Sequence, residues 1–218
     1  MKKRSLVIII LFILLSTISI HKNIKITKFN IKNINVENNS ILKTKEIKKL
    51  LSPLYNKNLI FLDEKEIEKV LIKISFIDSY RIKKKYPNTL QIKIFENKPI
   101  AILQKRKNKF YLSEKIDLIE FKSIKKYQNL PYVFGDEKKF KKFYNNLKKI
   151  DFPFQKVKKY IYYESNRWDI ETKKKIVIKL PTENYIESLK NFLDLENKNA
   201  FKNYKLFDYR INNQLILK

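Results

Sequence analysis

The sequence predicts an α+β protein with an N-terminal transmembrane helix, a small β-α-α-β-β unit and a mixed β-rich domain that contains two helices. Three observations predict this organisation. An apolar run occupies residues 6–20, residues 25–99 alternate between helical and strand-like spacing of apolar side chains, and residues 100–218 consist mainly of short strand-like segments. With 218 residues, 44% of them hydrophobic, the chain is long enough for an anchor and one larger or two small domains.

The apolar run Leu6–Ile20 follows a basic tip of Lys2, Lys3 and Arg4. Two interpretations are open, because a cleaved signal peptide ends in small residues of the A-x-A kind, whereas an anchor needs about 20 apolar residues to span about 30 Å. No such cleavage site follows the run. This favours an uncleaved anchor, with residues 1–5 as a cytoplasmic tip, residues 6–22 as the transmembrane anchor and the remainder outside the cytoplasm.

Residues 25–99 form the first predicted unit. Asn38 follows its first strand and can adopt the left-handed backbone of a turn, and Asp63 opens its second helix with Glu66 three residues on, as in a capping box. Both helices must bury their apolar faces on one side of a small sheet, which leaves the other side or an edge for another molecule. Strands are expected at 31–36, 80–83 and 90–94, and helices at 44–54 and 63–74.

Residues 100–218 form the second predicted unit. An aromatic stripe of Phe140, Phe143 and Tyr144 has helical spacing, which is more typical of a core than of a ligand pocket. Asn212 and Asn213 can supply the positive φ of a tight hairpin between the last two strands. Strands are expected at 101–104, 109–112, 117–121, 130–135, 157–164, 168–171, 175–180, 206–211 and 214–217, and helices around 140–150 and 182–193.

Composition excludes most catalytic chemistry. The chain has no Cys and one His, so thiol catalysis, a histidine metal site and a Ser-His triad are excluded, and the single Gly excludes phosphate-cradling glycine loops. The net charge of +27 is spread along the whole chain instead of forming a local basic stripe, which argues against nucleic-acid binding. We expect no enzyme activity, no metal and no cofactor.

Several short phrases resemble the FtsQ/DivIB family of cell-division proteins, and the β-α-α-β-β order is similar to a POTRA domain. The resemblance implies a POTRA domain at 25–99 and a distal β domain at 100–218, although the turn Gly common in the family is replaced by Asn38 and the cytoplasmic tail is short. The phrases are INVENN (34–39), NLIFLD (58–63), YPNTL (86–90), FENKPIA (95–101), RWDI (167–170), IKLP (178–181) and FDYR (207–210).

The resemblance implies a non-catalytic divisome scaffold that is anchored in the inner membrane, holds its folded domains in the periplasm and is enriched at the division septum. It also implies FtsB-like and FtsL-like partners, other divisome proteins at the POTRA domain, and a link between early and late division proteins. One alternative is a POTRA-bearing component of outer-membrane protein assembly or transport, which normally has a transmembrane barrel or several POTRA repeats. Another is a secreted enzyme or binding protein, which would need cleavage after the apolar run and a constellation of reactive side chains.

The C-terminal hairpin is the predicted partner-binding surface. The sequence ends at Lys218, directly after the last expected strand, so an uncovered strand edge could accept a strand from a partner. The resemblance implies that this partner is FtsB-like and that Arg167 pairs with one of its acidic residues. In the opposite interpretation, Leu215 and Leu217 are core residues of an internal strand. The predicted partner-binding residues are Arg167, Tyr209, Ile211, Asn213, Leu215 and Leu217.

A basic run precedes the predicted turn at 86–88 and contains Arg81, Lys83, Lys84 and Lys85. It either forms a solvated strand edge, where cations discourage unwanted strand pairing, or faces anionic lipid headgroups.

Overall fold

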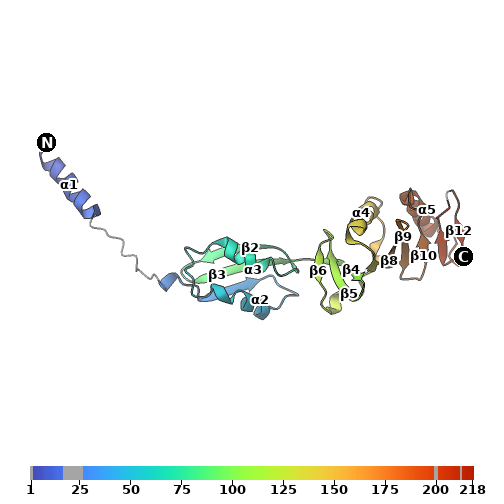
Figure 1. Ribbon diagram of the computed structural model, residues 1–218, viewed down its shortest axis with the longest axis horizontal. Coiled ribbons are helices and arrows are strands. Elements are labelled where there is room, and N and C mark those ends of the chain that lie inside the picture. Colours follow the sequence, from blue (N-terminus) through green and yellow to red (C-terminus); the bar gives the residue numbers. More distant parts are fainter. Residues whose placement is uncertain (1, 17–26, 199–200, 212) are drawn as a thin grey trace.

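The computed structural model describes residues 2–16, 27–198, 201–211 and 213–218. Helix α1 (Lys2–Ser16) begins the chain (Figure 1). Its side chains from Leu6 to Leu14 are exposed. Within the described ranges, no helix has both the length and the apolar character needed to cross a membrane. Residues 17–22 of the predicted anchor lie outside the described residues.

The first unit has the predicted order of elements, β1 (Asn33–Glu37), α2 (Thr44–Leu50), α3 (Glu64–Leu71), β2 (Ile77–Lys85) and β3 (Thr89–Glu96), with 3-10 turns at Thr27–Phe29 and Ser52–Leu54. The sheet order is β1-β3-β2, in which β3 pairs parallel with β1 and antiparallel with β2. Strand β2 is therefore an edge strand.

Local sequence signals explain where the helices of this unit begin. The Asp63 carboxylate accepts the backbone N–H of Lys65 at 3.0 Å and so caps α3. The spacing of Asp63 and Glu66 predicted a capping box. The contact observed for the Glu66 carboxylate is instead an ion pair with Lys57. Asn38 has a φ of 63°, as the predicted turn requires.

The second unit is a nine-stranded sheet in the order β12-β11-β10-β9-β8-β7-β4-β5-β6. Helices α4 (Glu137–Lys148) and α5 (Tyr185–Asn197) contribute to its core. The strands are β4 (Pro99–Lys105), β5 (Asn108–Ser113), β6 (Leu118–Glu120), β7 (Tyr132–Phe134), β8 (Val157–Tyr163), β9 (Arg167–Thr172), β10 (Val177–Lys179), β11 (Leu206–Asp208) and β12 (Ile216–Leu217).

The aromatic stripe of α4 is core. Phe143 stacks on Trp168 of β9, with ring centroids 4.8 Å apart and an interplanar angle of 11°.

The structure explains why residue 135 is glycine. A Cβ at this position would lie 2.6 Å from the Cβ of Tyr162, and the backbone φ of 154° is one that residues with a side chain rarely adopt.

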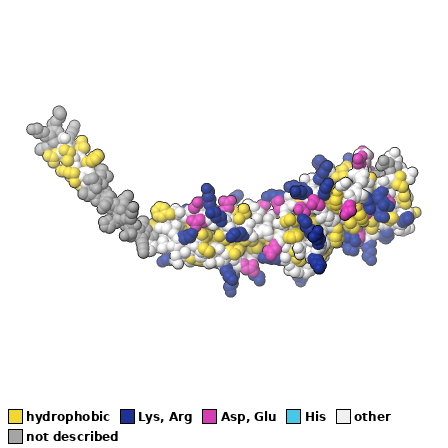
Figure 2. All heavy atoms as spheres, in the orientation of Figure 1, with side chains coloured by type: hydrophobic (Ala, Val, Ile, Leu, Met, Phe, Trp, Pro, Cys, Tyr) yellow, Lys and Arg dark blue, Asp and Glu magenta, His cyan; other side chains and the backbone are white. Residues whose placement is uncertain are grey.

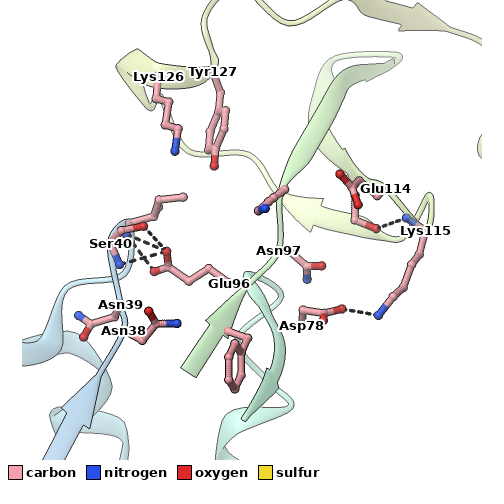
Figure 3. A pocket seen from close by; sticks show the side chains of 14 residues that line it. Asn38, Asn39, Ser40, Asp78, Glu96, Asn97, Glu114, Lys115, Lys126 and Tyr127 are labelled. Carbon is pink, nitrogen blue, oxygen red and sulfur yellow. Dashed lines mark hydrogen bonds and ion pairs between the residues drawn. The ribbon is translucent and has the colours of Figure 1, made fainter. Parts of the chain in front are cut away.

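The two units share a buried cluster at their junction. Tyr111 of β5 packs edge-on against Phe76 at a centroid distance of 6.0 Å and also contacts Phe121 and Tyr127. The N–H of Glu120 donates to the Ser75 hydroxyl at 3.0 Å. A hollow lined by both units lies beside this cluster, where Lys115 reaches across to Asp78 (Figure 3). Apolar packing and an ion pair therefore connect the two units.

Candidate partner-binding surface

Strand β12 forms one edge of the large sheet. It pairs antiparallel with β11, with Phe207 opposite Leu217 and Asp208 opposite Ile216. On its outer side, no strand pairs with it in the part of the chain that the structure describes.

Hydrogen bonding within the hairpin shows which amides face outward. The N–H of Lys218 donates to the carbonyl of Leu206 at 3.1 Å, and the N–H of Leu206 donates back at 2.9 Å. Bonded and non-bonded pairs alternate along an antiparallel ladder. The N–H and C=O of Leu217 therefore point away from β11, toward the open edge.

The two faces of the sheet differ sharply between β7 and β12. On one face, a row of apolar side chains runs through paired residues and is covered by α4 and α5. Because successive side chains of a strand point to opposite faces, the next residue of each strand lies on the other face, which we call the open sheet face. Its row consists of Phe134, Ile161, Asp169, Lys179, Asp208 and Ile216.

Two buried carboxylates lie on the open sheet face. Asp169 and Asp208 are 2% and 6% exposed, and each is opposite Lys179 in the strand pairing. Arg167 donates to Asp169 at 2.6 Å, and Arg210 donates through Nε and Nη2 to both oxygens of Asp208. These carboxylates and cations form the charge row of the open sheet face.

The two carboxyls respond differently to burial. Burial raises the pKa of Asp169, against the opposing effect of the Arg167 guanidinium. At Asp208, the hydrogen bond from Arg210 holds the pKa below its usual value. The charge row therefore contains one carboxylate that is well compensated and one that remains costly to ionise.

The hairpin residues fall in two environments. Tyr209 is 7% exposed, its hydroxyl donates to Asn191 at 3.0 Å, and burial raises its pKa to about 12. Leu215 and Leu217 are half-buried against the core cluster. Ile211 is 51% exposed, and Asn213 is exposed with a φ of 58°. The hairpin thus presents Ile211 and Asn213 most openly, while Tyr209 holds it to the core.

Arg167 lies at the start of β9, separated from β12 by β10 and β11. Its guanidinium lies 4.0 Å from the ring centroid of Tyr163. The structure therefore does not place Arg167 beside the hairpin, but it places both on one sheet, with Arg167 joined to the charge row.

Sequence reasoning missed Asp169, Lys179, Asp208 and Arg210 as members of this surface. The sequence contains a signal for this surface in the two motifs Arg167-x-Asp169 and Asp208-x-Arg210, because residues two apart on a strand share a face. A group of His, Cys, Asp and Glu side chains suited to a metal ion is not found among the described residues.

Two family models match consecutive parts of the chain. Residues 29–97 match the POTRA domain of FtsQ type, and residues 101–210 match the C-terminal domain of the cell division protein FtsQ/DivIB. The cell division protein FtsQ of Rickettsia bellii is 30% identical over 190 residues, which cover 85% of this chain and 71% of that protein. FtsQ of Agrobacterium fabrum is 25% identical over 187 residues, covering 84% and 59%.

The solved major extracytoplasmic domain of DivIB from Geobacillus stearothermophilus aligns with 49% of this chain and 98% of its own, with a TM-score of 0.35 and 15% identity. That likeness is too low to inform the fold. The two family models and the Rickettsia relative are sufficient: this chain belongs to the FtsQ/DivIB family of cell division proteins.

Proposed function

We propose that this chain is a non-catalytic, membrane-anchored scaffold of cell division that binds FtsB-like and FtsL-like proteins outside the cytoplasm. The observation that carries the proposal is the outer edge of β12, where the N–H and C=O of Leu217 point away from β11. Family membership supports a division role and gives no support to outer-membrane protein assembly.

An open strand edge is a template for strand addition. Exposed edges invite aggregation, and proteins that retain one commonly use it to pair with a partner strand. Backbone hydrogen bonds would then set the register of the partner, and side chains on alternate positions would set its specificity. The half-buried Leu215 and Leu217 keep β12 on the sheet and so keep this edge extended.

The charge of the neighbouring face indicates the chemistry of the partner. Three cations, Arg167, Lys179 and Arg210, face two carboxylates on the open sheet face. Lys218 lies beside the hairpin and adds a further exposed cation. The surplus of positive charge favours a strand that carries acidic residues, with an apolar side chain over Ile216, which is 38% exposed.

We infer that residues 6–22, which include most of α1, form the anchor, with the N-terminus in the cytoplasm and the folded domains in the periplasm. The support is the exposed apolar surface of Leu6–Leu14 and the basic residues before it. A protein anchored in this way would be located at the division septum and would link early and late division proteins there.

The test separates backbone pairing from side-chain packing at one position. Leu217→Pro removes the outward N–H without breaking the hydrogen bonds of β12 with β11, whereas Leu217→Ala removes packing but keeps the N–H. Capture of the FtsB-like and FtsL-like proteins by the full-length chain in detergent should fall at least tenfold for Leu217→Pro and much less for Leu217→Ala.

Circular dichroism of both variants must match that of the parent chain. A folded Leu217→Pro variant that captures its partners at full strength would eliminate strand addition at β12.

A further inference from the structure

Hydrophobic side chains are exposed at the end of the POTRA domain where the chain enters it. Phe61 is 79% exposed, Tyr86 is 59% exposed and Ile60 is 39% exposed. Phe29 packs edge-on against Tyr86, with ring centroids 6.1 Å apart. We call these four residues the entry patch, and hydrophobic surface is visible at this end of the folded body (Figure 2).

The loop that carries Phe61 is held in place from three sides. The N–H of Leu59 donates to the carbonyl of Phe29 at 2.8 Å, and the N–H of Ile60 donates to the Asn58 side chain at 2.9 Å. Lys84 donates to the carbonyl of Leu62 at 2.8 Å. Because Leu59 and Leu62 are buried on either side, the loop is fixed with Phe61 pointing outward.

Exposed lysines lie next to residues of the entry patch along the chain. Lys28, Lys32 and Lys85 are exposed beside Phe29, β1 and Tyr86 respectively. Of the acidic side chains that follow Phe61, Asp63 caps α3 and Glu66 pairs with Lys57, while Glu64 is exposed. An aromatic surface rimmed by lysines is the combination that binds an anionic membrane interface, where rings reside at headgroup level and lysines contact phosphate.

The course of the chain places this patch near α1. Ten residues separate Ser16, the end of α1, from Thr27, the start of the folded body, and ten residues span at most about 35 Å. The hydrogen bond from Leu59 to Phe29 joins the patch to this entry point. The tether therefore confines the entry patch to the vicinity of α1, whereas β12 lies at the far end of the body (Figure 1).

We propose that the entry patch docks onto the anionic phospholipid surface beside α1 and so fixes the POTRA domain against the bilayer. This inference rests on the proposed anchor. It changes the role of the predicted basic run, because Lys84 is engaged with the Phe61 loop and Arg81 lies over Phe95, 5.4 Å from its ring centroid. The lipid contact would come from Lys85, Lys28 and the aromatic rings.

The absence of cysteine from the sequence allows a direct measurement. Phe61→Cys carries an environment-sensitive aromatic label at the patch, and Ile72→Cys, at a residue 75% exposed beyond the other end of α3, is the matched control. The full-length chain is reconstituted into phosphatidylethanolamine and phosphatidylglycerol vesicles and recovered by flotation. Lipids spin-labelled near the headgroup should quench the label at 61 at least threefold more than the label at 72.

Each other outcome contradicts the proposal. Equal quenching at both positions in floated vesicles would overturn docking while leaving the anchor intact, and failure of the chain to float would overturn both. Blue-shifted but unquenched emission at 61 would show that a second copy or a protein partner covers the patch. The double variant Phe61→Asp with Tyr86→Asp should lose docking yet capture the FtsB-like partner normally, which separates this proposal from that for β12.

Discussion

The carboxylate of Glu96 binds several groups of the turn after β1. It lies at the end of β3 and accepts the N–H groups of Ile41 at 2.9 Å and Leu42 at 2.8 Å, together with the Ser40 hydroxyl at 2.7 Å (Figure 3). Burial alone would raise the pKa of Glu96, but the hydrogen bonds from Leu42, Ser40 and Ile41 outweigh it and hold the pKa below its usual value.

Replacing this carboxylate should destabilise the POTRA domain in a pH-dependent way. Glu96→Gln should lower the free energy of unfolding by about 1–2 kcal/mol at pH 7, since several charge-assisted hydrogen bonds become neutral. A lowered folded-state pKa stabilises the fold above the usual value of 4.5 and loses that contribution as pH falls through the folded value. The gap between variant and parent should therefore shrink between pH 5 and about pH 3.

Urea unfolding of the full-length chain in detergent, followed by circular dichroism, measures this gap. Glu68→Gln is the control, because Glu68 is an exposed carboxylate on α3. A gap that stays constant from pH 7 to pH 3 would contradict the assigned role of Glu96.

At the scale of single elements, the sequence predicted most strands and helices because their apolar spacing is local information. The hairpin at Asn213 and the two core helices α4 and α5 are examples. Strand β11 was expected at 206–211 but ends at Asp208, because its side chain turns back and accepts the N–H of Arg210 at 3.1 Å. Tyr209 and Ile211 were expected on the same strand. Because β11 ends before them, Tyr209 is buried in the core and Ile211 is exposed.

The charge row could not be predicted from spacing alone. Asp169, Lys179 and Asp208 come from three strands, and they meet only because β10 lies between β9 and β11 with a defined register.

The end of the helix after Asp63 also differs from the sequence-based expectation. Ile74 continues the apolar spacing of this helix, but α3 ends at Leu71. A turn then follows, in which the N–H of Ile74 donates to the carbonyl of Leu71 at 3.0 Å.

At the scale of the whole molecule, the two proposed surfaces lie at opposite ends of one body. The entry patch lies where the chain enters the POTRA domain, and β12 lies at the far end of the sheet of the second unit (Figure 1). The shared cluster around Phe76 and Tyr111 connects the two units between them. As a spacer, this body would hold the proposed partner-binding edge of β12 away from the bilayer.

This arrangement requires that the N-terminal segment is retained. Mass analysis of the protein purified from membranes should show a chain that still contains Leu6–Ile20, because the A-x-A-like cleavage pattern is missing from the run. A fluorescent fusion of the same full-length chain should concentrate at midcell in dividing cells. A soluble product that begins near His21 or Asn23 would contradict the anchor and the spacer together.

Hydrogen–deuterium exchange of the full-length chain, with and without the FtsB-like partner, tests strand addition at β12 most directly. The amide of Leu217 points to the open edge and should exchange quickly in the free protein. Pairing with a partner strand would slow its exchange at least tenfold, and the peptide covering residues 214–218 should report this protection. Unchanged exchange across 214–218 in the saturated complex, with protection elsewhere such as at the β2 edge, would contradict the account.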